Sequence, residues 1–184
     1  MNSVFDIDNT FKRSQLEIIS NASYKLLWEY LIPYKKEKLP EGVSFKVAAG
    51  KKCYDIIRLY QSGEYFFSQK FIDVLFNFVD MSDKCYPIRI DGIEEQYYVI
   101  HNLEHLRYLN KEKAIFDEEP SFYCGKEIAT PLFGVTNTLC YVVTEEIMNA
   151  LIKNKISNIC FEESFLCTEK EYEVWHNSRL NRLF

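Results

Sequence analysis

The sequence predicts an α+β fold with a mixed, mostly antiparallel sheet and helices packed against it. The chain has 184 residues, a length that suits one domain, so 1–184 is interpreted as a single domain. Hydrophobic residues make up 47% of the chain and charged residues 27%, which is an ordinary globular composition. Short alternating runs of apolar and polar residues, typical of strands, are separated by a few segments with helical spacing.

The first half of the chain mixes helix and strand signals. Apolar residues at helical spacing predict a helix over Ser23–Ile32, and Pro33 ends it. Ser68 can cap a second helix that runs to about Phe78. Pro87 marks its strand as an edge strand, because proline cannot donate to a ladder of hydrogen bonds. Strands are expected over 43–47, 55–60, 65–67, 85–90 and 96–100.

The second half is regular only toward its end, because the stretch 104–137 shows no clear period. Beyond it, the expected elements are strands over 139–143 and 156–161 and, between them, a helix capped by Thr144 that ends near Lys153. Thr168 and Glu171 have the spacing of a capping box and predict a last helix.

One internal similarity links the two halves. Tyr65–Leu75 resembles Tyr141–Leu151 at an offset of 141 − 65 = 76 residues. In each, an apolar strand runs into a hydroxyl helix cap, then a helix, then another strand. The pattern predicts two similar strand–helix–strand units, since one helix cannot cover a sheet alone. Independent use of the same strand-to-helix chemistry is the alternative.

Charge is divided unevenly along the chain. Residues 1–80 carry 11 basic and 10 acidic side chains, net +1, and residues 81–184 carry 11 and 17, net −6, which sum to −5. An acidic half disfavours nucleic acid or an anionic membrane as the partner and favours a basic protein. The alternative interpretation is that the charge serves solubility.

The expected cellular location and the redox state of the cysteines follow from two kinds of segment that the sequence does not show. No uncharged apolar run approaches the roughly 18 residues of a membrane span. The N-terminus Met1–Asp8 carries acids where a signal peptide carries bases. We therefore expect a cytoplasmic protein with reduced thiols and without a membrane partner.

His101, Glu104 and His105 match the H-x-x-E-H pattern of inverted zinc proteases. In a helix, the two histidines would share one face and Glu104 could act as general base. The pattern directly follows a predicted strand, however, and nothing marks a third zinc ligand. Two surface or half-buried histidines are the preferred interpretation, and a small zinc-dependent hydrolase is the alternative.

No other pattern indicates catalysis. The six cysteines show no C-x-x-C spacing, so neither a zinc ribbon nor a thioredoxin-type site is supported. Cys85, Cys140 and Cys160 lie in predicted strands, whereas Cys124 or Cys167 could be a reactive thiol. Motifs of serine hydrolases, P-loop proteins and dinucleotide-binding proteins are absent, so we expect neither an enzyme nor a cofactor.

Two stretches resemble a bacterial immunity-protein family of polymorphic toxin systems, first described as a domain of unknown function. One is Gly63–Leu75 with Tyr97–Leu103, and the other is Tyr141–Leu151 with Ile159–Glu163. Members show an apolar–Ser–x–x–apolar helix entry and a late strand–Thr/Ser–helix–strand unit. Here His101 replaces an apolar residue or Asn, and Lys155–Asn158 replaces the usual Gly before the last strand.

The resemblance covers about 43–165, which it identifies as an immunity-like core. Residues 1–42 form an unmatched N-terminal segment, and 166–184 form a C-terminal helix. The family resemblance implies a non-catalytic cytoplasmic protein that binds and neutralises a cognate toxin, with no catalytic residues to carry over. It assigns neither contact residues nor an oligomeric state. A regulatory or scaffold binding module is a further alternative.

Overall fold

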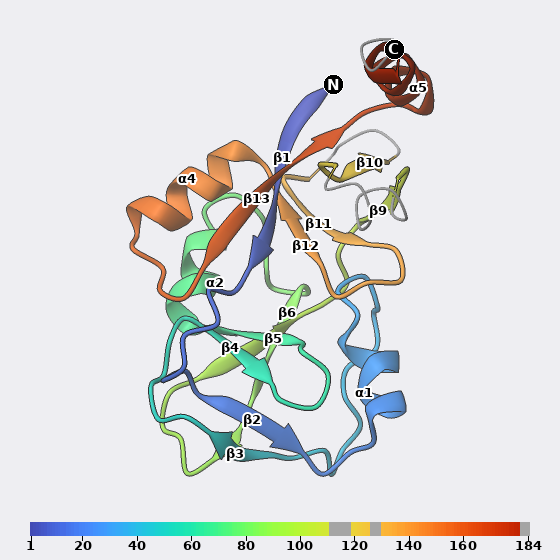
Figure 1. Ribbon diagram of the computed structural model, residues 1–184. Coiled ribbons are helices and arrows are strands. Elements are labelled where there is room, and N and C mark those ends of the chain that lie inside the picture. The colour runs from blue at the N-terminus through green and yellow to red at the C-terminus, as the bar shows by residue number, and fades with distance from the viewer. Residues whose placement is uncertain (111–118, 126–129, 181–184) are drawn as a thin grey trace.

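Two barrel-like β-sheets, one above the other in Figure 1, make up most of the chain. The computed structural model describes residues 1–110, 119–125 and 130–180. The predicted α+β class and the mostly antiparallel pairing are confirmed, but the strands form two sheets rather than one. We call these sheets the upper barrel and the lower barrel.

The upper barrel is a closed sheet with the strand order β1-β12-β11-β9-β10-β13. Its strands are β1 (Asn2–Asp8), β9 (His105–Tyr108), β10 (Phe122–Cys124), β11 (Leu132–Val135), β12 (Tyr141–Val143) and β13 (Cys160–Leu166). The first strand of the chain therefore lies between strands near its end, and β1 pairs with β13 over seven residues.

The lower barrel has the strand order β6-β8-β5-β4-β2-β3-β7. Its strands are β2 (Glu17–Ser20), β3 (Phe45–Ala49), β4 (Ile56–Leu59), β5 (Tyr65–Ser68), β6 (Cys85–Ile88), β7 (Ile90–Asp91) and β8 (Tyr97–Ile100). β6 and β7 are separated only by Arg89, yet they lie at opposite ends of the order. The sheet therefore curls back on itself, and β6 is the edge strand that Pro87 predicted.

The two barrels share one pattern of strand pairing. In the lower barrel, β6–β8, β8–β5, β5–β4 and β2–β3 are antiparallel, and β4–β2 and β3–β7 are parallel. In the upper barrel, β13–β1, β1–β12, β12–β11 and β9–β10 are antiparallel, and β11–β9 and β10–β13 are parallel. In this pattern β1 has the place in the upper barrel that β8 has in the lower one.

The helices are α1 (Tyr24–Leu31), α2 (Gln69–Leu75), α4 (Glu145–Lys153) and α5 (Glu169–Leu180). α2 and α4 contact each other between the two barrels. There Phe67 packs against Phe71 and Tyr141, with ring centroids 4.6 and 5.0 Å apart, and Ile147 and Leu151 of α4 are fully buried beside them. This central core holds the barrels together, while each barrel interior has an apolar cluster of its own.

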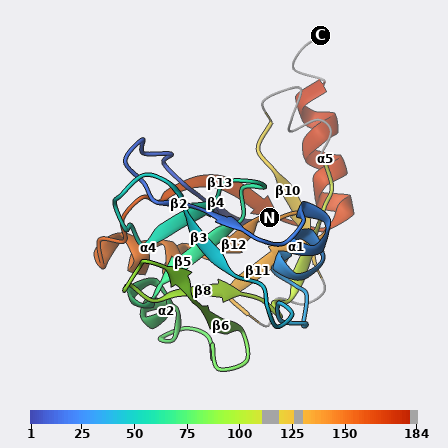
Figure 2. The same cartoon turned by 90° about the horizontal axis from the view of Figure 1, so that it is seen from below.

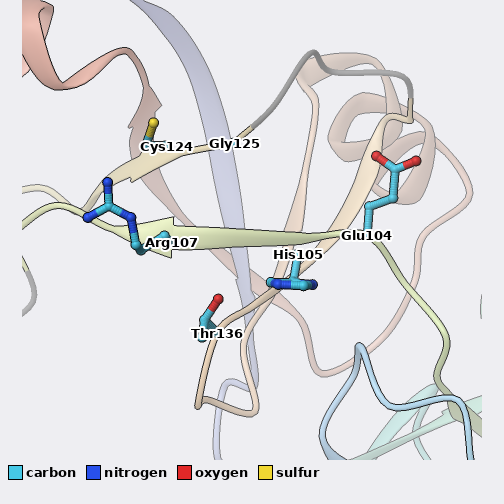
Figure 3. A pocket seen from close by; sticks show the side chains of 6 residues that line it. All are labelled: Glu104, His105, Arg107, Cys124, Gly125 and Thr136. Carbon is cyan, nitrogen blue, oxygen red and sulfur yellow. The ribbon is translucent and has the colours of Figure 1, made fainter.

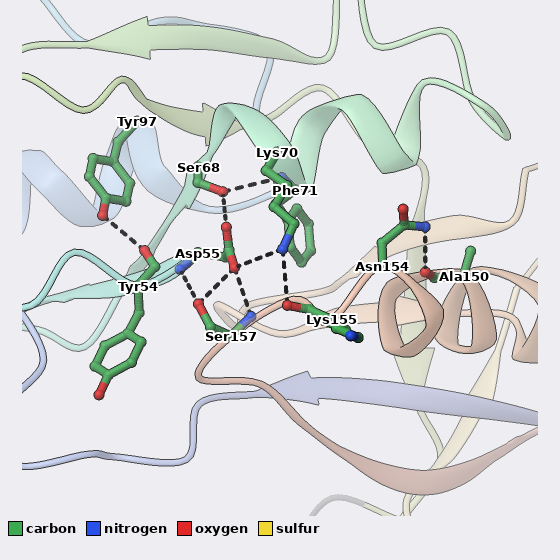
Figure 4. A network of polar contacts seen from close by, with 10 residues as sticks. All are labelled: Tyr54, Asp55, Ser68, Lys70, Phe71, Tyr97, Ala150, Asn154, Lys155 and Ser157. Carbon is green, nitrogen blue, oxygen red and sulfur yellow. Dashed lines mark hydrogen bonds and ion pairs between the residues drawn. The ribbon is translucent and has the colours of Figure 1, made fainter.

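A polar network also joins the barrels (Figure 4). Asp55, just before β4, accepts hydrogen bonds from the Ser68 hydroxyl and from the backbone N–H and hydroxyl of Ser157, all at 2.7 Å. Ser157 lies in the loop between α4 and β13. Lys70 Nζ is 3.8 Å from the Asp55 carboxylate and donates to the Lys155 carbonyl at 3.0 Å. Burial opposes ionisation of Asp55, but the Ser157 and Ser68 hydrogen bonds lower its pKa overall.

The last helix, α5, projects away from both barrels, as Figure 2 shows. The predicted capping box forms, because Glu171 N–H donates to Thr168 Oγ1 at 3.2 Å and Thr168 N–H donates to Glu171 Oε2 at 2.8 Å. The inner side of α5 rests on Phe122, whose ring centroid is 5.1 Å from Tyr172 and 4.4 Å from Trp175. The rest of the predicted segment, 181–184, lies outside the described residues.

Several element predictions were wrong in detail. The stretch 104–137 contains β9, β10 and β11 instead of irregular chain. The strand expected over 156–161 begins only at Cys160, because Lys155 and Asn158 have left-handed φ values of 53° and 62°. Residues 1–42, which the family resemblance does not cover, contribute β1 to the upper barrel and β2 to the lower barrel.

The helix boundaries agree more closely with expectation. Ser23 and Ser68 are the N-caps of α1 and α2, and each hydroxyl accepts a backbone N–H. α2 ends at Leu75, earlier than predicted. Thr144 has the N-cap position of α4, but its hydroxyl makes no cap bond. Across the described ranges, no helix is long and apolar enough to cross a membrane.

Candidate functional site

The H-x-x-E-H segment is not helical. His101 follows β8 and is buried, with its ring 4.9 Å from the Tyr86 ring centroid. The next two residues are tied to the loop after α1, because Asn102 N–H donates to the Lys35 carbonyl at 2.7 Å and Leu103 N–H donates to the Pro33 carbonyl at 3.0 Å. These bonds turn the chain before it enters β9, so the two histidines do not share a helix face.

The histidines differ in environment. Burial, reinforced by the Lys38 charge, lowers the pKa of His101 and favours the neutral imidazole. His105 is exposed in β9, with its ring centroid 4.7 Å from that of Tyr34. Glu104 and His105 leave the chain in different directions (Figure 3). Among residues 1–110, 119–125 and 130–180, no group of three His, Cys, Asp or Glu side chains is placed to hold a metal ion.

Glu104 and His105 instead line a surface pocket of ≈ 570 Å³ on the upper barrel (Figure 3). The other lining residues are Arg107, Cys124, Gly125 and Thr136. β9 presents His105 and Arg107 outward, because Leu106 between them points into the barrel. Cys124 of β10 is directly opposite Arg107 in the strand register. The pocket therefore offers an imidazole, a guanidinium and a thiol to a partner.

One lining residue of the pocket, Arg107, also contacts α5. Arg107 is engaged by an ion pair with Glu169 of α5, which links the pocket to the projecting helix. No hydrogen bond between Cys124 and His105, or between Glu104 and His105, is present in the described part of the chain. Such a bond is the usual sign of a nucleophile paired with its base.

Exposed carboxylates dominate the surface of the upper barrel and its helices. They are Glu104, Glu145, Glu146, Glu162, Glu163, Glu169, Glu171 and Glu173. The exposed cations described on the same part of the molecule are fewer, namely Arg107, Lys153, Lys155 and Lys170. The excess of acids in the second half of the sequence thus lies mostly on the upper barrel and its two helices. We call this set of glutamates the acidic surface.

The cysteines are all free thiols. Cys140 and Cys160 flank β1 near Asp8, and burial raises the pKa of both thiols. Cys167 is buried, and its pKa is also raised by burial, which leaves it in the unreactive thiol form. Of the two thiols singled out in the sequence, only Cys124 reaches the pocket.

A carboxylate inside the upper barrel was missed by sequence reasoning. Asp6 of β1 accepts a hydrogen bond from the Tyr123 hydroxyl at 2.7 Å and another from Ser164. Burial raises the pKa of Asp6 to about 6; the hydrogen bonds from Ser164 and Tyr123 oppose the rise, and the charges of Glu162 and Asp8 add to it. The alternation of apolar and acidic residues over Phe5–Asp8 was the available signal for this strand.

Comparison with known proteins adds no assignment. No family model matches the chain, and no curated protein is significantly similar to it.

Proposed function

We propose that this chain is a non-catalytic cytoplasmic protein that binds and neutralises a cognate, basic bacterial toxin. The observation that carries the proposal is the acidic surface on the upper barrel, where exposed glutamates outnumber exposed cations. Such a surface attracts a basic protein over several ångströms and raises the rate of encounter. The family resemblance of the sequence supports the same role, and an acidic surface disfavours nucleic acid as the partner.

The pair Glu162 and Glu163 offers a sharp test of the surface. Both side chains are exposed in the middle of β13, and neither forms an ion pair with a described lysine or arginine. Glu94 and Glu95 are an equally exposed pair on the lower barrel. Reversing either pair changes the net charge by the same amount, and the Glu163 variant also loses the hydrogen bond from the Ser3 hydroxyl at 2.9 Å.

The experiment is co-expression with the toxin encoded by the neighbouring gene. We expect the wild-type chain and the Glu94→Lys, Glu95→Lys variant to restore growth. The Glu162→Lys, Glu163→Lys variant should bind the toxin about tenfold or more weakly, because like charges across an interface repel. Equal binding by both variants would contradict the acidic surface as the contact. Failure of the wild-type chain to restore growth would contradict the immunity function itself.

The zinc hydrolase is the competing proposal and has a direct test. We expect purified protein to contain less than stoichiometric zinc by elemental analysis. Stoichiometric zinc that disappears in the His101→Ala, His105→Ala variant would favour the hydrolase instead.

We also propose that β5–α2–β6 and β12–α4–β13 are two copies of one strand–helix–strand unit. Two features of the pairing support this. In each unit the two strands run parallel to each other, and one antiparallel strand, β8 or β1, lies between them. In both, a hydroxyl residue is the N-cap of the helix.

A further inference from the structure

The lower barrel has an opening at the point where its sheet closes. β7 pairs with β3 at Phe45 and Lys46, but β6, one residue earlier in the chain, pairs only with β8. A pocket of ≈ 530 Å³ lies at this opening, between β3, β6 and the segment 38–44. Its volume is within the range of small-molecule sites, which often lie at the mouths of barrels.

Part of the pocket lining is apolar and held in place. Phe45, Tyr86 and Ile88 are buried members of the lower-barrel core. The ring of Phe45 packs edge-on against Phe66 with centroids 5.2 Å apart. The Tyr86 hydroxyl accepts a hydrogen bond from Leu39 N–H at 3.3 Å, which ties the covering segment to β6. A ligand would therefore meet a preformed apolar floor.

The rim of the pocket carries a net positive charge. Lys38 and Arg89 are exposed lining residues, and Asp91 is the acidic one. No ion pair joins either cation to a carboxylate within the described ranges. Lys38 Nζ lies 5.7 Å from the Tyr86 ring centroid, so the ammonium is held at the mouth of the apolar site.

A strand from another protein fits this opening poorly. Pro87 lies in the middle of β6 and lacks the N–H that an added strand would need.

An apolar floor beneath two unpaired cations instead matches a small amphipathic anion. We propose that this pocket binds a small molecule with an apolar body and one carboxylate or sulfonate group, which Lys38 and Arg89 contact. The site is independent of the proposed toxin binding.

The test uses two fluorescent probes of similar shape. 1-Anilinonaphthalene-8-sulfonate is anionic, and N-phenyl-1-naphthylamine is its neutral counterpart. We expect the folded protein at neutral pH to bind the anionic probe saturably at one site. The Lys38→Gln, Arg89→Gln variant should bind it about tenfold more weakly, as expected for the loss of charge-assisted contacts. Binding of the neutral probe should change less than about twofold.

Two further variants complete the test. Val43→Trp fills the pocket without changing charge and should abolish binding of both probes, with the thermal melt as a check on folding. Lys51→Gln, Lys52→Gln removes the same charge from the same barrel outside the pocket and should leave binding unchanged. The proposal is overturned if binding does not saturate, if Val43→Trp binds as the wild type does, or if the two charge variants weaken the anionic probe equally.

Discussion

The Asp6 carboxyl group shows how one buried residue sets a pH dependence. Its pKa of about 6 in the folded chain lies above that of an unfolded Asp, so the folded state binds the proton more tightly. Stability should therefore fall as pH rises from about 4 to 6 and stay reduced above pH 6. Asp6→Asn removes this penalty and should stabilise the protein by on the order of 2 kcal/mol at pH 7.5.

Urea unfolding of the wild type and Asp6→Asn at pH 4.5 and pH 7.5 measures this effect. The gain in the free energy of unfolding of Asp6→Asn should be present at pH 7.5. It should be small at pH 4.5, where the wild-type Asp6 carboxyl is protonated in the folded state. Asp91→Asn, at an exposed position, serves as the control. An equal gain at both pH values would contradict the assignment to proton binding.

Lys155 gives a second prediction for a single residue. Its φ of 53° is left-handed, a conformation that costs a side chain about 1 kcal/mol and glycine almost nothing. Lys155→Gly should therefore stabilise the protein by about 0.5–1 kcal/mol in thermal or urea unfolding. Lys153→Gly, at the last residue of α4, should destabilise it by about 0.5 kcal/mol instead. If both variants were destabilised, the left-handed strain would not be the deciding term.

The role of a single residue could be predicted from the sequence where its hydrogen-bond partner lies only a few positions away. Ser68 caps α2 through a residue three positions on, and Thr168 pairs with Glu171 at the same spacing. The environments of Asp55 and Asp6 depend on Ser157 and Ser164, which lie 102 and 158 residues away. No local pattern could have predicted those contacts.

Asp55 connects three parts of the fold, because it joins the start of β4 and the N-cap of α2 to the loop before β13. Asp55→Ala leaves the Ser68 and Ser157 donors without their acceptor and should cost about 3 kcal/mol of stability. Because the pKa of Asp55 is lowered in the folded state, the wild-type contribution is present above about pH 4 and lost at more acid pH.

Urea unfolding at pH 7 checks the size of the loss, and unfolding near pH 3 should show a smaller difference between the two proteins. Asp73→Ala, at an exposed position of α2, should change stability by no more than about 0.5 kcal/mol. If Asp55→Ala lowers the free energy of unfolding no more than Asp73→Ala does, the polar network does not hold the barrels together.

Removal of β1 should destabilise the upper barrel and leave the lower barrel protected. Val4 belongs to the interior cluster of the upper barrel and Ile7 to the central core, so a variant lacking residues 1–8 loses a strand between β12 and β13. Hydrogen exchange should then show lost protection in β12 and β13 and retained protection in β4 and β5.

A synthetic peptide of residues 1–10 should restore protection in the truncated protein, since it supplies the missing strand. The same peptide with Val4→Asp and Ile7→Asp should not, because both side chains must enter apolar clusters. Unchanged protection without residues 1–8 would contradict the role of β1 in closing the barrel.

The elements that the sequence did not reveal share a physical cause. β9, β10 and β11 have only four, three and four residues, which leaves little pattern to read, although β4 and β5 are as short and were predicted from their apolar residues. β9 pairs with β10 and β11, β10 also pairs with β13, and β11 also pairs with β12, so most of these contacts join distant parts of the sequence. α1, α2 and α4 were predictable because caps and apolar faces are encoded within each helix. The candidate pocket was only partly anticipated, since His105 was noted as a zinc ligand, Glu104 as a general base and Cys124 as a reactive thiol, whereas Arg107 was not noted.

For the whole molecule, the α+β class follows from composition and pattern, but closure into two barrels follows from strand order. The uneven charge of the sequence becomes a surface only because β13, α4 and α5 all belong to the upper side. If this surface binds a toxin, as we propose, the two proteins must form a stable complex.

The most direct measurement is the mass of the species formed when purified chain and purified toxin from the neighbouring gene are mixed at physiological salt. Size-exclusion chromatography with light scattering should give one peak whose mass is the sum of both proteins, and the toxin in that peak should be inactive. Two separate peaks, each with the mass of one protein and with active toxin, would contradict the account.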